Sequence, residues 1–266
     1  MKTFIVDSFT NTLFRGNPAG VCIVDQPLSD ATMLNIAQEL NLSETAFIKA
    51  TDGHGNFEIR FFSPKMEIPL CGHATLASAR VASTTFDLKE AQFKTIENVV
   101  LPVQISKDAI RITFPVYETS PAQPPASLLA ALGLDSVQNS VFNEQTKILL
   151  LEISDTQALA NLTPDFEALI KSHQSIHGVL VTAPSTADGF DFHSRYFWPW
   201  SGTNEDPVTG GTHTFLAKYW SVRLGKTKMK SFQSSKRTGS MEVELLGEKL
   251  IITSQAIIVL EGNLFL

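Results

Sequence analysis

Cysteine is scarce in this sequence. Only Cys22 and Cys71 occur among 266 residues. Two thiols are too few for a disulfide framework, and with one histidine near Cys71 they are too few for a structural zinc site. The scarcity excludes the small disulfide-rich domains and the zinc-finger classes of protein.

Long apolar runs and basic clusters are missing as well. No segment approaches the roughly 18 uncharged apolar residues of a membrane span, and the N-terminus reaches Asp7 after three apolar residues, too early for a signal-peptide core. With 21 Lys and Arg against 27 Asp and Glu, the net charge is −6, and no basic stripe is available to neutralise phosphates. We therefore expect a cytoplasmic protein that binds a small molecule, with neither nucleic acid nor membrane as a partner.

Cofactor signatures are likewise absent. The sequence contains no Gly-x-Gly-x-x-Gly segment, no phosphate loop and no cluster of metal-ligand residues. We expect no cofactor and no metal, which leaves proton transfer by side chains as the chemistry available to an enzyme of this composition.

A repeated pattern is what the chain does contain. Arg60-Phe61-Phe62-Ser63-Pro64 leads into Cys71-Gly72-His73-Ala74-Thr75-Leu76-Ala77, and 135 residues after Arg60 the segment Arg195-Tyr196-Phe197-Trp198-Pro199 leads into Thr209-Gly210-Gly211-Thr212-His213-Thr214-Phe215-Leu216-Ala217. Each copy passes from a β-type aromatic stretch to a Gly-containing turn and then to a helical run. The pattern predicts duplicated domains whose helix starts face each other across a cleft and bind a small carboxylate.

The domain boundary is predicted in a proline-rich segment. Residues 118–125 contain three prolines and no strong helix or strand pattern. This places an N-terminal domain at 1–118 and a C-terminal domain at 119–266, and it leaves open whether the last residues cross back to the first domain.

Periodicity and turn residues predict an alternation of strands with one long helix in each half. A tight turn is expected over 16–20, where Gly and Asn-Pro occur together. The two long helices are expected at 73–82 and at 212–224. Further helices are expected at 31–40, 127–132 and 165–171, and strands at 4–9, 21–24, 45–50, 57–62, 99–105, 109–114, 148–153, 178–182, 190–198, 241–246, 250–254 and 256–260.

Four motifs in a fixed order resemble the PhzF family of phenazine-biosynthesis-like proteins. They are Asn17-Pro18-Ala19-Gly20-Val21, Leu42-Ser43-Glu44-Thr45-Ala46-Phe47, Pro69-Leu70-Cys71-Gly72-His73-Ala74-Thr75-Leu76-Ala77 and Glu205-Asp206-Pro207-Val208-Thr209-Gly210. The resemblance covers essentially the whole chain. It implies an α+β fold of diaminopimelate epimerase type, with two duplicated domains that each wrap a curled, mainly antiparallel sheet around a central helix.

The resemblance implies that Glu44 and His73 are catalytic. Glu44 would be the general acid/base that moves a proton on a cyclic amino acid, with a pKa tuned upward by partial burial. His73 would donate a proton or bind a substrate carboxylate. From spacing alone, Glu44 also fits a surface acid or a helix-capping group, and His73 fits a capping or core histidine.

In the second half the resemblance implies that Asp206 holds the substrate amino group, with Glu205 as a weaker substitute. An Asx-type turn before Pro207 is the structural alternative for Asp206. Gly72 and Gly210 would let a carboxylate approach the backbone N–H groups of the helix starts.

The chain departs from the family pattern at Gly211, where a serine is usual. Thr209, Thr212 and Thr214 are candidates to replace the lost hydroxyl, and the phenazine-precursor substrate is placed in doubt. Among these candidates, Thr209 is included with Gly72, Gly210 and Gly211 in the expected substrate-binding set.

Cysteine placement separates two mechanisms. An epimerase of the diaminopimelate type needs one thiol from each half, but Cys22 and Cys71 both lie in the first half. We therefore expect a carboxylate-based isomerase. A binding protein without turnover, and a hydrolase or lyase in which Glu44 activates water, stay open as alternatives, and so does a homodimer.

Overall fold

The computed structural model describes residues 1–185 and 188–266 and divides the chain into two units. Unit 1 comprises residues 1–114 and 251–266, and unit 2 comprises residues 115–250. The C-terminal strand β18 (Ala256–Asn263) therefore belongs with the N-terminal part of the chain, where it pairs antiparallel with strand β1 (Lys2–Ser8).

Unit 1 holds two helices, α1 and α2, among its described residues. Helix α1 spans Asp30–Leu40 and helix α2 spans Gly72–Phe86. Besides β1 and β18, the strands are β2 (Asn17–Ile23), β3 (Glu44–Ala50), β4 (Asn56–Phe62), β5 (Glu67–Ile68), β6 (Glu90–Lys94), β7 (Val100–Ile105) and β8 (Ile110–Pro115).

Unit 2 has the same order of elements with a larger helical layer. Its helices are α3 (Ala126–Leu132), α4 (Thr156–Ala160), α5 (Phe166–Ser172), the 3-10 turn η1 (Pro199–Ser201) and α6 (His213–Leu224), and its strands are β9 (Ser120–Pro121), β10 (Asn139–Asn143), β11 (Ile148–Glu152), β12 (Gly178–Pro184), β13 (Phe192–Trp198), β14 (Thr203–Asp206), β15 (Lys228–Gln233) and β16 (Gly239–Leu246). Strand β17 (Lys249–Ser254) runs through the division between the units.

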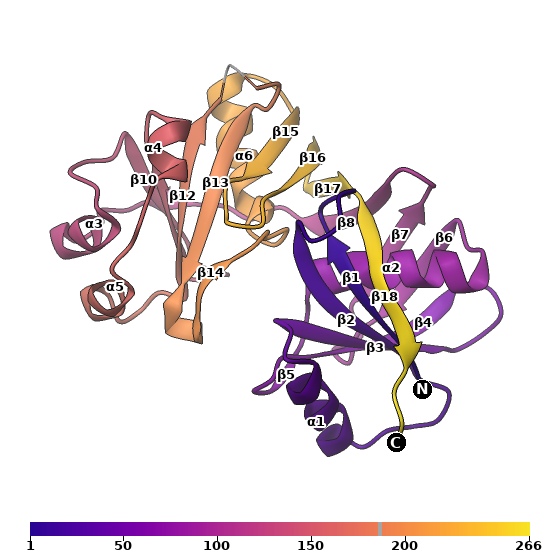
Figure 1. Cartoon of the computed structure of the whole chain (residues 1–266). Coiled ribbons are helices and arrows are strands. Elements are labelled where there is room, and N and C mark those ends of the chain that lie inside the picture. Colours follow the sequence, from indigo (N-terminus) through magenta and orange to yellow (C-terminus); the bar gives the residue numbers. More distant parts are fainter. Residues whose placement is uncertain (186–187) are drawn as a thin grey trace. The chain divides into compact units, whose positions relative to one another are not determined.

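Strand pairing repeats from one unit to the other. In unit 1, β1 pairs antiparallel with β2, β2 parallel with β3, β3 antiparallel with β4, β4 antiparallel with β5 and parallel with β6, and β6 antiparallel with β7. In unit 2 the series β10 to β16 shows the same directions in the same order. The duplicated, mainly antiparallel α+β fold expected from the sequence is confirmed (Figure 1).

Helix α2 is the centre of unit 1. It is almost entirely buried from His73 to Ala82 and contacts β1, β2, β3, β6, β7 and β18. Small residues permit this, because alanine side chains let strands approach the helix from several sides, and the hydroxyls of Thr75 and Ser78 bond to carbonyls one turn back, at 2.7 Å each. In unit 2 the counterpart α6 contacts β15 and β16, and its Trp220 stacks on Phe192 of β13 with ring centroids 5.5 Å apart.

The other helices cover sheet faces. Helix α1 starts where Ser29 accepts a hydrogen bond from the Thr32 amide at 3.1 Å, and its apolar face joins Phe47 and Phe62 in one cluster. In unit 2, α3, α4 and α5 contribute residues to a larger cluster with β11, β12 and β13. Burial of these apolar faces is the main favourable term for both units.

Each unit repeats one arginine–glutamate ion pair, which is partly buried in unit 1 and more deeply buried in unit 2. Arg60 on β4 forms a two-pronged bond to Glu67 on β5, at 2.7 and 2.6 Å, and Arg195 on β13 does the same to Glu205 on β14, at 2.7 and 2.8 Å. Both guanidinium groups also lie over the ring two residues further along their strand. The repeated arginine seen in the sequence therefore fixes one hairpin in each unit. Both carboxylate oxygens of Glu205 accept hydrogen bonds from Arg195.

Two expectations about local structure are wrong. The tight turn is not at 16–20, because strand β2 begins at Asn17 and the chain reverses before it, at Gly16 with a φ of 68°. Pro18 is tolerated near the start of that strand. Several short elements were also missed, namely β5, β6, β9, β10, β14, β15 and α4.

No helix among the described residues is long and apolar enough to cross a membrane.

The duplicated ion pairs predict unequal stability losses. The Arg195 side chain is 10% exposed and also donates to the carbonyls of Leu159, Ala160 and Leu162, whereas the Arg60 side chain is 25% exposed. Arg195→Met should lower the free energy of unfolding by about 3–5 kcal/mol, because it leaves buried acceptors and Glu205 unpaired. Arg60→Met should cost only about 1 kcal/mol. Urea denaturation of both variants measures the difference, and equal losses would contradict the assignment.

Candidate active site

Glu44 is the first residue of β3, directly after Ser43. Strand β3 pairs in parallel with β2, and Glu44 lies opposite Ala19 in that register. This pairing draws the carboxylate inside the unit, where the residue is only 6% exposed. A carboxylate this far from water needs hydrogen-bond partners, and helix α2 supplies one.

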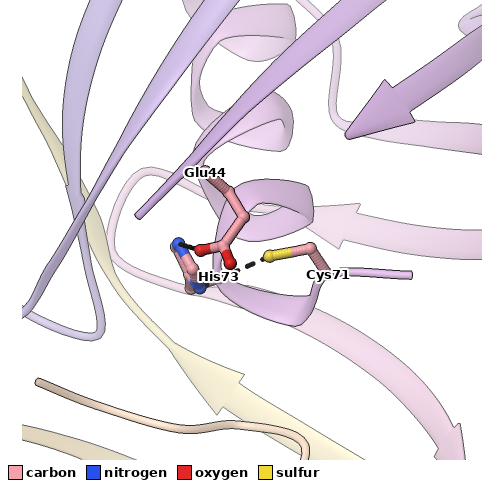
Figure 2. Close-up of side chains that lie close together, drawn as sticks. All are labelled: Glu44, Cys71 and His73. Atoms are coloured by element: carbon pink, nitrogen blue, oxygen red, sulfur yellow. Dashed lines mark hydrogen bonds and ion pairs between the residues drawn. The ribbon is translucent and has the colours of Figure 1, made fainter. Parts of the chain in front are cut away.

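His73 lies in the first turn of α2, and its ring is held from both sides. Its Nε2 lies 3.1 Å from Glu44 Oε2, while its Nδ1 lies 3.4 Å from Cys71 Sγ (Figure 2). The Ser43 Oγ lies 3.3 Å from the same Nε2. The backbone carbonyl of His73 accepts a bond from the Ser8 hydroxyl at 2.8 Å, which ties the helix start to β1. The structure thus brings the two expected catalytic residues of the first half into direct contact.

The two groups shift each other toward the charged state. Burial by itself raises the pKa of Glu44, but hydrogen bonds from His73 and Ser43 outweigh it, and the net pKa is lowered. Burial by itself lowers the pKa of His73, but Cys71 and Glu44 outweigh it, and the net pKa is raised well above its ordinary value. The expectation that partial burial raises the pKa of Glu44 is therefore wrong in the free protein, because hydrogen-bond donors lie next to the carboxylate and lower its pKa.

Cys71 is the N-cap residue of α2 and is 8% exposed. Burial raises the pKa of its thiol, with Glu44 adding to that effect and His73 opposing it. Cys22 lies elsewhere in unit 1, on β2, where its sulfur contacts the Thr3 hydroxyl at 3.6 Å. A buried Cys71 with a raised pKa fits the packing role expected from the sequence.

In unit 2, Asp206 ends strand β14 and is 7% exposed. The Thr209 hydroxyl donates to its carboxylate, so Thr209 and Asp206 form a closed turn around Pro207. The donor is a side-chain hydroxyl rather than the backbone N–H of an Asx-type turn, and the bond holds the carboxylate in one orientation.

The glycines lie at helix starts. Gly72 is the first residue of α2, and a Cβ there would come within 3.4 Å of Phe114. Gly210 and Gly211 form the turn before α6, where their carbonyls accept from the amides of His213 and Thr214 at 3.0 and 3.3 Å. A Cβ on Gly211 would meet no atom within 4 Å, so the space of the expected serine is present although the side chain is not.

Two residues that shape this turn were missed as site residues. Gln233 bridges it, accepting from the Thr209 amide at 2.9 Å and donating to the Asp206 carbonyl at 2.7 Å. His213 is fully buried and bonds the Thr209 carbonyl through Nδ1 at 3.0 Å and Ser231 Oγ through Nε2 at 2.8 Å. Burial lowers the pKa of His213 to about 4, so it is a neutral support. A β-strand glutamine carries no sequence pattern that would reveal this role.

Comparison with known proteins places the chain in a family. The family model of phenazine biosynthesis-like proteins (PhzC-PhzF) matches residues 6–262. The chain belongs to this family. It is 40% identical over 267 residues to a Pseudomonas aeruginosa protein described as an uncharacterised isomerase, covering 100% of this chain and 99% of the relative. It is also 40% identical over 287 residues to phenazine biosynthesis-like domain-containing protein 2 of mouse, covering 99% of both.

Solved structures of family members have the same fold. A PhzF-family protein of Enterococcus faecalis superposes with a TM-score of 0.90 at 36% identity, over 100% of this chain and 99% of the other. At 12% identity the likeness to a probable proline racemase of Agrobacterium radiobacter, with a TM-score of 0.63, shows the shared fold alone. The chain therefore shares both family and fold with these solved family members.

The Glu44–His73 pair predicts a stability window in pH. The raised pKa of His73 adds stability that is complete below its ordinary 6.5 and is lost as the pH rises through the folded value. The lowered pKa of Glu44 adds stability that is complete above its ordinary 4.5 and is lost as the pH falls through the folded value. Both contributions are therefore complete between these two limits. NMR titration of the His73 ring nitrogens should show an imidazolium at pH 7, and Glu44→Gln should lower that pKa because it removes one of the partners that raise it. An unchanged pKa in the variant would argue against the pair.

Proposed function

We propose that this protein is an isomerase that moves a proton on a small amino acid or a cyclic amino-dienoic acid, without a cofactor. In this proposal Glu44 is the general acid/base, and His73 supplies or stabilises the second proton. Asp206 holds the substrate amino group, while the backbone at Gly72, Gly210 and Gly211 and the Thr209 hydroxyl contact the substrate. The roles of Asp206 and of the glycines come from the family resemblance.

The observation that carries the proposal is the 3.1 Å contact between the Glu44 carboxylate and the His73 ring in a buried setting. One partner of the pair lacks a proton and the other holds one, which is the arrangement that proton removal and return require. Entry of a substrate that takes the His73 hydrogen bond would release Glu44 from the contact that lowers its pKa, and its basicity would rise at the moment of reaction.

The thiols support the same choice. A two-thiol racemase needs a cysteine on each face of the reacting carbon, but Cys22 and Cys71 both belong to unit 1, and unit 2 has none. The raised pKa of Cys71 further opposes a thiolate nucleophile. A carboxylate therefore fits the central role better than a thiol.

A ligand-binding protein without turnover is the second candidate. Gly211 favours this candidate. The family pattern has a serine at this position, but here the space beside the Gly211 Cα is open and no hydroxyl occupies it. Small amino and cyclic carboxylic acids should raise the melting temperature under either candidate, since both bind the native state only. Solvent deuterium separates them, because only the isomerase incorporates it into the ligand.

Substitution of the acid/base group is the sharpest functional test. Glu44→Gln should keep the fold and bind ligand but slow solvent-proton exchange by about 10²–10⁴, the usual worth of a positioned acid/base. Asp206→Asn should weaken ligand binding more than it slows exchange, because its proposed task is to hold the amino group. Mass spectrometry of deuterium incorporation measures both effects.

Cys71→Ala is the matched control. It removes the polar neighbour of His73 Nδ1 and should have a far milder effect on exchange than Glu44→Gln. Loss of exchange in Cys71→Ala together with normal exchange in Glu44→Gln would overturn the assignment in favour of a thiol mechanism.

A further inference from the structure

Glu44, Cys71 and His73 form a cluster whose donor atoms all lie within 4.8 Å of one another. The three residues come from the start of β3 and from the first turn of α2, and each is 6–8% exposed. They combine a carboxylate, a thiol and an imidazole. This is a set of ligands for a soft or borderline cation, and the sequence did not reveal it because Glu44 is 27 residues from Cys71 along the chain.

The spacing of the cluster fits a tetrahedral metal. Bonds of about 2.3 Å to sulfur and about 2.0–2.1 Å to nitrogen place these two atoms about 3.5 Å apart. Cys71 Sγ and His73 Nδ1 are 3.4 Å apart. The Glu44 carboxylate lies on the Nε2 side of the ring, and its donor oxygen lies within 4.8 Å of the other two donor atoms, so it must move toward the sulfur to act as the third ligand.

The surroundings supply what a metal-bound histidine needs. With Nδ1 on the metal, Nε2–H keeps an acceptor in Ser43 Oγ at 3.3 Å, and Ser43 in turn donates to the Pro18 carbonyl at 3.4 Å. Such a partner orients the ring. A thiolate and a carboxylate balance two positive charges, so the occupied site would be neutral within its buried setting.

We propose that Glu44, Cys71 and His73 bind Zn²⁺ as a three-residue site with one coordination position left for water. The functional consequence rests on the proposed function. The bound ion would inhibit the isomerase, because it occupies Glu44 and His73, the two groups that transfer the proton. The sulfur and nitrogen ligands select zinc-like ions over Mg²⁺, which prefers oxygen ligands.

Cobalt provides a direct readout, because Co²⁺ bound to a thiolate absorbs in the near ultraviolet. The full-length chain, treated with chelator and without substrate, should bind one Co²⁺ with this absorption band, and Zn²⁺ should displace it while Mg²⁺ should not. Cys71→Ser should abolish the band with little change in side-chain volume. Cys22→Ala removes the other thiol and should leave the band intact.

Two further measurements complete the test. Glu44→Gln should weaken Zn²⁺ binding at least tenfold, as calorimetry measures, because it removes a charged ligand. Circular dichroism verifies that each variant is folded. Absence of the band in the wild-type chain, or its persistence in Cys71→Ser, would overturn the site. Solvent-proton exchange that continues at saturating Zn²⁺ would overturn the inhibition. A wild-type chain without any exchange would count against the proposed function alone, since the cobalt band needs no substrate.

Discussion

Burial of the polar start of α2 is the constraint on which unit 1 depends. A helix inside a sheet brings unpaired amides and polar side chains into a region without water, and each must find a partner there. The Ser8 hydroxyl donates to the His73 carbonyl, and Ser43 and Glu44 contact the His73 ring. The Thr75 hydroxyl donates to the Cys71 carbonyl. The same contacts that stabilise the helix therefore assemble the candidate proton-transfer groups.

The two units have kept their scaffold and diverged at the helix starts. Each preserves an arginine on its aromatic strand and a glutamate on the next strand, and this pair locks the hairpin that leads to the helix. At the start of α2 the chain places titratable side chains. Before α6 it places Gly210 and Gly211, with a turn braced by Gln233 and His213. Unit 1 thus places a carboxylate, an imidazole and a thiol at its helix start, and unit 2 fixes the orientation of Asp206 and of a backbone turn.

The charge state of Glu44 shows how neighbours outweigh burial. Desolvation favours a neutral acid, yet a donor at 3.1 Å and the serine beside it reverse the direction of the pKa shift. In the free protein the Glu44 carboxylate is therefore ionised and in contact with the His73 imidazolium. Under both proposals, a ligand or ion that separates Glu44 from His73 would change the basicity of both groups.

The sequence by itself determined the duplication, the α+β class, the long helices and the residues of the family motifs, because these depend on local periodicity and on ordered segments that one chain displays in full. It did not reveal the short strands or the start of β2, since a few residues carry little periodicity and pairing with neighbours decides their conformation. Only the tertiary structure decided that His73 lies against Glu44, that Cys71 lies on the other side of the same ring, and that Gln233 closes the Asp206 turn. These contacts join residues from different strands and helices, and the pKa of each group follows from them rather than from its place in the sequence.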